Sequence, residues 1–121
     1  MLLYEDLTRT IIGAAMEVHR ALGPGFIESV YEMALGKELT DMKIPVEHQA
    51  PVPVVYKGVE LGKYFADILV DGKIILEIKA ASALIPRHDA QAIHYLAATK
   101  LRLALLLNFG TPKLQFKRII R

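Results

Sequence analysis

Three charged side chains interrupt the most apolar stretch of the sequence, and their types suit phosphodiester hydrolysis. Asp67 lies in one apolar run, and Glu77 and Lys79 lie in the next. Because strand side chains alternate between faces, Glu77 and Lys79 share a face. An unpaired charge inside a sheet costs several kcal/mol, so such groups normally have a partner or a metal ion. An Asp followed by Glu-x-Lys on the next strand therefore predicts a divalent-metal site.

The turn between the two runs decides whether the two acids meet. They would project from opposite faces if the turn were the two residues Asp71-Gly72. They are diagonal neighbours on one face if the loop spans residues 70–72 with a left-handed glycine, because Leu69 then pairs with Lys73. We predict this bulged loop, and with it an unbroken apolar surface on the other face. That surface would comprise Tyr64, Ala66, Ile68, Val70, Ile74, Leu76 and Ile78.

The elements that must position this hairpin follow from the spacing of apolar residues and from the breaker residues. Apolar residues at helical spacing predict helices over residues 6–22, 27–42 and 87–100. Extended segments are predicted over residues 46–56, 59–70, 73–80, 102–109 and 114–120. The prolines in the first of these place it at a sheet edge. The continuous apolar run at 102–109 is typical of a strand that is covered on both faces.

The predicted order of elements is α-α-β-β-β-α-β-β. The helix between Lys79 and Arg102 is a crossover, so the strands on either side of it should lie parallel with a right-handed connection. This order predicts an α/β fold, a mixed β-sheet flanked by helices. No internal repeat or interdomain linker is visible, so we expect residues 1–121 to form one domain.

The composition excludes several classes of site. The absence of cysteine excludes disulfides and cysteine-based zinc sites, and the four histidines lack metal-ligand spacing. A net charge of +2 does not by itself indicate nucleic-acid binding. No signal peptide is visible and no apolar run is long enough to span a membrane. We therefore expect a soluble, cytoplasmic protein without membrane contacts.

Four motifs together resemble the PD-(D/E)xK nuclease superfamily. Asp67 followed by Glu77-Ile78-Lys79 resembles its catalytic core. The segment from Gln91 to Tyr95 resembles the Q-x-x-x-Y helix motif of RecB-like members, and Gly25 to Tyr31 matches the signature of the small GxxExxY proteins. The resemblance covers residues 25–109. Ala66 stands where the superfamily name has proline, and because that proline is not a ligand, little is put in doubt.

This resemblance implies a restriction-endonuclease-like fold and a metal-dependent nuclease that acts on nucleic acid, with DNA favoured over RNA. Asp67 and Glu77 would be oxygen ligands of Mg²⁺ or Mn²⁺, and Glu28 would help to hold the metal directly or through water. Lys79 would orient or deprotonate the attacking water, or stabilise developing charge. Gln91 would fix Lys79 or a phosphate, and Tyr95 the substrate backbone. The implied site is thus Glu28, Asp67, Glu77, Lys79, Gln91 and Tyr95.

Ordinary structural explanations stay open for each of these residues. Glu28 could complement the helix dipole, and Asp67 could be a solvent-facing charge on an edge strand. Glu77 and Lys79 could form a cross-strand surface pattern, and the Gln91 and Tyr95 pair could be part of a helix interface. We interpret Tyr31 as a packing residue and the histidines His19, His88 and His94 as incidental. The basic C-terminal edge could contact phosphates, but we interpret it as a solvated, protective edge. It comprises Lys113, Lys117, Arg118 and Arg121.

The motifs and the composition leave two candidate functions. The leading one is a nuclease, and the alternative is a non-catalytic nucleic-acid-binding or assembly module on the same fold. A small-molecule enzyme has little support, because no glycine-rich phosphate loop, nucleophile elbow or cofactor motif is present. The chain has no room for a separate recognition domain, so specificity would come from a second copy, a partner protein or the shape of the substrate.

Overall fold

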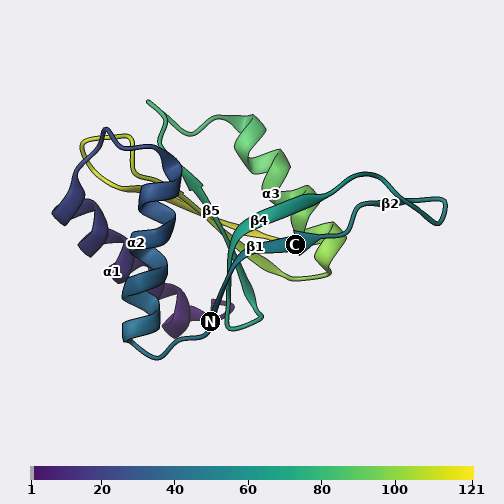
Figure 1. Cartoon of the computed structure of the whole chain (residues 1–121), viewed down its shortest axis with the longest axis horizontal. Helices are drawn as coiled ribbons and strands as arrows, with labels where there is room; N and C mark the ends of the chain where they lie inside the picture. The colour runs from purple at the N-terminus through teal and green to yellow at the C-terminus, as the bar shows by residue number, and fades with distance from the viewer. Residues whose placement is uncertain (1) are drawn as a thin grey trace.

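The computed structural model describes residues 2–121, which form three helices, a five-stranded sheet and a two-stranded sheet (Figure 1). The helices are α1 (Glu5–Leu22), α2 (Glu28–Asp41) and α3 (Pro86–Thr99). The larger sheet contains β1 (Val46–Val52), β4 (Tyr64–Val70), β5 (Ile74–Lys79), β6 (Leu103–Asn108) and β7 (Gln115–Ile120). The smaller sheet contains β2 (Val55–Tyr56) and β3 (Val59–Glu60). Over the described residues, no helix combines the length and the apolar character that a membrane crossing requires.

The large sheet has the strand order β1-β4-β5-β6-β7. Strands β5 and β6 are parallel and are joined through α3, while the other neighbours are antiparallel. The predicted mixed sheet with a helical crossover is therefore confirmed, and so are the edge positions of β1 and β7. All six residues of β6 are buried, as expected for a strand that is covered on both faces.

Two apolar clusters hold the layers together. Helices α1 and α2 pack on one face of the sheet through residues such as Ile11, Tyr31 and Leu35. Helix α3 packs on the other face through Ala92 and Leu96. Figure 1 shows α1 and α2 on one side of the strands and α3 on the other. Alternate residues of β6 contribute to both clusters, so this strand is the centre of the molecule.

Tyr31 fixes the turn between α1 and α2. Its side chain is fully buried, and its ring stacks on Phe109 with 4.7 Å between ring centroids. Its hydroxyl donates a hydrogen bond to the carbonyl oxygen of Gly23 at 2.5 Å and accepts one from the backbone N–H of Phe26 at 3.1 Å. Tyr31 is therefore a packing residue that ties the Gly-Pro-Gly turn to the core.

The β4–β5 hairpin has the predicted loop length but a different register. Val70 pairs with Ile74, so the loop spans residues 71–73 rather than 70–72, and the predicted pair of Leu69 with Lys73 is wrong. Both Asp71 (φ 52°) and Gly72 (φ 63°) are left-handed. The N–H of Asp71 donates to the carbonyl oxygen of Pro45 at 2.8 Å, which fixes the residue outside the ladder. Asp67 and Glu77 come directly after the last pair of this ladder, Ile68 with Leu76, and their side chains meet through a hydrogen bond.

Strands β1 and β4 change faces at the same level of the sheet. Ile68 and Val70 pack in the cluster under α1 and α2, whereas Ala66 and Val52 pack in the cluster under α3. The switch occurs at Gln49, whose φ of 53° lies in the left-handed region that glutamine rarely adopts. The predicted unbroken surface is therefore wrong at its start, because Ala66 lies on the α3 side and Tyr64 is half exposed.

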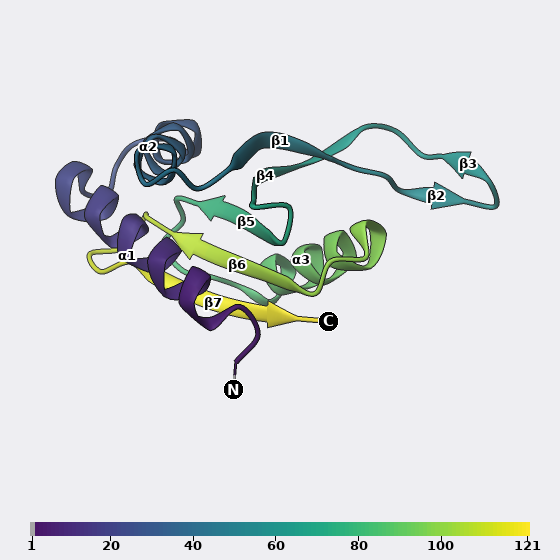
Figure 2. The same cartoon turned by 90° about the horizontal axis from the view of Figure 1, so that it is seen from below.

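Two predicted strands are each broken into two pieces. The segment 46–56 stops at Val52, because Pro53 has no N–H to continue the ladder, and resumes as β2. The segment 59–70 is likewise divided into β3 and β4. The short pair of β2 and β3 extends well beyond the rest of the sheet (Figure 2). We call residues 53–63 the arm.

Candidate active site

The site is built where β4 and β5 separate. The ladder between these strands runs from the pair of Val70 with Ile74 to the pair of Ile68 with Leu76. Beyond that point the side chain of Asp67 replaces the backbone as a partner, since its Oδ2 accepts a hydrogen bond from the N–H of Ile78 at 2.6 Å. The face change in β4 thus turns the Asp67 carboxylate toward β5.

Glu77 is the most perturbed acid in the molecule. It is only 3% exposed, and burial raises the pKa of its carboxyl group to about 8. The nearby Asp67 carboxylate raises this pKa further, the Lys79 ammonium lowers it, and a hydrogen bond with Asp67 together with the charge of Glu32 adds to the increase. Its Oε1 is buried without a hydrogen-bond partner in the described part of the chain. The charge of Lys79 therefore does not offset the effect of burial and of the neighbouring carboxylates on Glu77.

Lys79 is connected to helix α3 through a short polar chain. Its Nζ donates a hydrogen bond to Oε1 of Gln91 at 3.1 Å, and Nε2 of Gln91 donates to the hydroxyl of Tyr95 at 3.4 Å. Burial and then the nearby Glu77 carboxylate raise the pKa of Tyr95 above its usual range. The helical spacing of Gln91 and Tyr95 thus places both on the face of α3 that borders β5.

The structure places a further acid near the site, Glu32 of α2, which the sequence analysis does not predict as a site residue. The residue is buried, its Oε1 accepts a hydrogen bond from Nε2 of Gln49, and its Oε2 contacts Nδ1 of His48, both at 2.9 Å. Gln49 falls opposite Asp67 in the β1–β4 register. Because Glu32 also raises the pKa of Glu77, its carboxylate belongs to the electrostatic surroundings of the site.

A model of the PD-(D/E)XK nuclease superfamily matches residues 5–119 of the chain. The chain belongs to this superfamily. The match is to the superfamily as a whole, so membership of the GxxExxY branch stays a prediction. A search of curated proteins found no match.

Two solved structures share the fold. The crystal structure of SSO0001 superposes with a TM-score of 0.60 and 19% identity, over 77% of this chain and 49% of that one. The alkaline exonuclease LHK-Exo from Laribacter hongkongensis superposes with a TM-score of 0.52 and 13% identity, over 71% of this chain and 52% of the other. The chain therefore spans about half the length of each, and at these identities the likeness concerns the fold alone.

Within this PD-(D/E)XK framework, the structure brings together Asp67, Glu77, Lys79, Gln91 and Tyr95 but does not bring Glu28 to them. Glu28 is exposed in the first turn of α2. Over residues 2–121, no three Asp, Glu or His side chains converge on a point that could hold a metal ion. The expected set of three acidic ligands is thus not assembled. One turn later, Glu32 shares the buried side of α2 with Leu35 and Leu39, and this spacing was a signal in the sequence.

The two carboxylates that do meet fit a divalent cation. A hard ion such as Mg²⁺ takes oxygen ligands and keeps several waters, so two carboxylates suffice as protein ligands. Within residues 2–121, Glu77 offers a buried oxygen without a hydrogen-bond partner, and burial together with the Asp67 carboxylate raises the pKa of its carboxyl group. His88 does not belong to this set, because its Nδ1 accepts a hydrogen bond from the N–H of Ile85 and caps α3.

Gly36 in α2 leaves room for the His48 ring, which contacts Glu32. A Cβ at this position would overlap the His48 ring at Nε2 and Cε1. We expect Gly36→Ala to displace the ring from Glu32 and to destabilise the protein by about 1–3 kcal/mol, since Glu32 would lose a buried partner. Gly13→Ala in α1 is the matched control, because nothing lies within 4 Å of a Cβ there. Alanine should stabilise that helix by up to about 1 kcal/mol.

Urea denaturation of both variants measures this difference. If both alanine variants were stabilised equally, the contact between the His48 ring and α2 would not contribute to the stability of the protein.

Proposed function

We propose that the protein is a metal-dependent nuclease that hydrolyses phosphodiester bonds in nucleic acid, and DNA rather than RNA. The observation that carries this proposal is the buried Oε1 of Glu77, which has no hydrogen-bond partner among the residues that the structure describes. It lies beside the Asp67 carboxylate and two residues before Lys79. Membership of the PD-(D/E)XK nuclease superfamily supports the same chemistry.

Asp67 and Glu77 would hold Mg²⁺ or Mn²⁺, with the remaining positions filled by water. When bound, such an ion polarises a phosphoryl oxygen and lowers the pKa of its water. The hydrogen bond from Ile78 fixes the Asp67 carboxylate before any ion arrives. Glu32, held by His48 and Gln49, would contribute the negative charge that the resemblance assigns to Glu28.

Lys79 would act on the phosphate or on the attacking water. It lies on the same strand face as Glu77, and its hydrogen bond to Gln91 holds the ammonium group in the site. A fixed ammonium stabilises the charge that develops on the phosphate oxygens in the transition state. Gln91 is thus a positioning residue for Lys79, and Tyr95 would contact the substrate backbone.

Cleavage assays test this proposal. Purified protein should cleave nucleic acid with Mg²⁺ or Mn²⁺ and should be inactive in EDTA, when single- and double-stranded DNA and RNA are offered as substrates. Lys79→Ala should lower the rate by about 100-fold or more, as loss of a transition-state charge contact does. Equal cleavage by wild type and Lys79→Ala would contradict the role of Lys79.

One observation favours the alternative of a non-catalytic module. With a pKa of about 8, the Glu77 carboxyl group is protonated at neutral pH unless a cation is bound. Calorimetric titration with Mn²⁺ separates the two functions. Binding that Asp67→Asn abolishes would support the nuclease, and absence of binding to wild type would support the module.

A further inference from the structure

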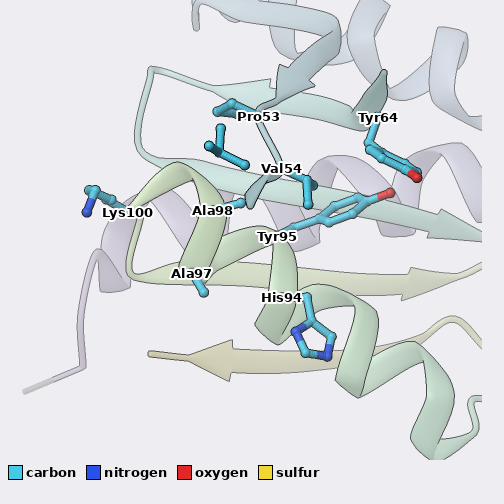
Figure 3. A pocket seen from close by; sticks show the side chains of 9 residues that line it. Pro53, Val54, Tyr64, His94, Tyr95, Ala97, Ala98 and Lys100 are labelled. Carbon is cyan, nitrogen blue, oxygen red and sulfur yellow. The ribbon is translucent and has the colours of Figure 1, made fainter. Parts of the chain in front are cut away.

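A cavity of about 630 Å³ lies beside the candidate active site, between the start of the arm and helix α3 (Figure 3). Tyr64, His94, Tyr95 and Lys100 contribute its polar groups, and proline, valine and alanine side chains form the rest of its lining. We call it the arm pocket. It has the composition of an aromatic and apolar site with one cation, Lys100, at its edge.

The arm pocket and the candidate active site share a residue. Tyr95 lines the pocket, and its hydroxyl accepts the hydrogen bond from Gln91, which in turn holds Lys79. Figure 3 shows the rings of Tyr64 and Tyr95 close together, with Lys100 at the other end of the cavity. A molecule in the pocket would therefore reach the residues around Lys79 without crossing another element.

The pocket has the dimensions of a path for a nucleic-acid strand. On α3 its lining runs from His94 to Lys100, about 9 Å at 1.5 Å per residue, which is roughly the length of three stacked nucleotides. Single strands bind where aromatic rings stack on bases and cations follow the phosphates. Tyr64 is 46% exposed, so its ring is available for such a contact. In a duplex, the base faces are stacked inside the helix and cannot make it.

The charge around the pocket favours nucleic acid over a second copy of the chain. The arm carries Lys57 and Lys63, Lys100 follows at the end of α3, and Glu60 is the one acid in the arm. The Lys57 ammonium lies 5.3 Å from the centre of the Tyr56 ring, so the arm also combines a cation with an aromatic face. In such a pair, the lysine ammonium suits a phosphate group and the tyrosine ring suits a base.

We propose that the arm pocket binds an unpaired nucleobase, so that the protein acts on single-stranded segments of nucleic acid. The proposal rests on the proposed nuclease function, because it names the substrate class of that site. It assigns a binding role to Tyr64 and Lys100, which no motif of the sequence marks.

Binding of labelled strands tests the proposal without requiring cleavage. Fluorescence anisotropy in EDTA would compare an oligothymidine of about 20 nucleotides, longer than most single-strand sites, with a hairpin duplex. We expect tighter binding of the single strand, and Tyr64→Ala should weaken it by about 5- to 100-fold, the effect of losing one base stack. Tyr64→Phe, which keeps the ring, should bind nearly as wild type. Phe116→Ala on β7 is the matched control, because Phe116 is 45% exposed.

A second pair of variants tests the proposed contact between Lys100 and a phosphate group. Lys100 and Lys43 are both left-handed, with φ of 61° and 62°, and asparagine tolerates this conformation. Lys100→Asn should reduce the slope of log Kd against log salt by about 0.7, as expected for one lost contact to a single strand. Lys43→Asn, at the end of α2, should leave the slope unchanged.

Three results would overturn the proposal. These are equal binding by Tyr64→Ala and Phe116→Ala, equal affinity of the wild type for duplex and single strand, and a dimer in sedimentation that Tyr64→Ala dissociates, which would assign the pocket to a second copy. Single-strand binding that depends on Tyr64 without any cleavage in Mg²⁺ would instead overturn the nuclease function and leave the pocket intact.

Discussion

Glu77→Gln is expected to remove most of the pH dependence that the wild-type protein shows in its stability. The unperturbed pKa of glutamate is 4.5, and the folded protein raises it to about 8. Between these values the folded chain keeps a proton that the unfolded chain has lost. Stability therefore falls as the pH rises, by about 1.4 kcal/mol per pH unit and on the order of 4 kcal/mol between about pH 5 and pH 8.

Glutamine reproduces the protonated form of Glu77, because its amide can donate a hydrogen bond to Asp67 as the carboxylic acid does. The variant should thus be more stable than wild type at pH 8 and similar to it at pH 5. Urea denaturation at several pH values measures the difference. Mg²⁺ should restore the stability of wild type at pH 8, since a bound cation favours the carboxylate, and should not change Glu77→Gln.

The same substitution should abolish cleavage, because it removes one of two carboxylate ligands. Glu28→Gln is the matched control, because Glu28 is exposed and does not join Asp67 and Glu77. We expect it to change neither the pH profile nor the cleavage rate. A wild-type stability that stays constant from pH 5 to pH 8 in EDTA would contradict this description of Glu77.

Asn108→Ala is expected to destabilise the protein by about 3 kcal/mol or more. Asn108 is fully buried at the end of β6, and its Oδ1 accepts hydrogen bonds from the N–H groups of Ala81 at 3.0 Å and Gly110 at 3.1 Å. Its Nδ2 donates to the carbonyl oxygen of Ala81 and to Oε1 of Gln115, both at 3.0 Å. Alanine would leave two backbone donors without their partner, each at a cost of about 1–3 kcal/mol.

The effect of this variant should extend to the site. Ala81 lies two residues beyond Lys79, so Asn108 fixes the backbone on which the Lys79 side chain depends. Gln115→Ala is the control, because it removes one bond of the network at an exposed residue and should cost less than about 1 kcal/mol. Similar urea midpoints for the two variants would show that the Ala81 segment is held by other contacts.

Much of the architecture is predictable because it follows from apolar spacing. The crossover helix, the doubly buried β6 and the shared face of Glu77 and Lys79 all depend on periods of 3.6 or 2 residues, which the sequence displays directly. The register of the hairpin does not follow from apolar spacing. It depends on Asp71, which adopts a left-handed backbone and donates its N–H to Pro45.

Two features of the site had weaker signals. The face change in β1 relies on a left-handed Gln49, a residue type that gives no indication of this backbone in a sequence. Glu32 was visible through its spacing with Leu35 and Leu39, but an acid on an apolar helix face is recognised as functional only when its partners are known. Those partners, His48 and Gln49, come from β1 and meet Glu32 through tertiary packing.

The arm and the Asp67 carboxylate belong to one continuous length of chain. The arm ends at Lys63, and β4 starts at Tyr64 and reaches Asp67 three residues later. At 3.3 Å per residue, Tyr64 and Asp67 are separated by about 10 Å of extended backbone. In this segment, Tyr64, Phe65 and Ala66 are paired with β1, and the pairing resumes at Ile68. The length of this extended segment therefore sets the distance between the arm pocket at Tyr64 and the candidate active site at Asp67.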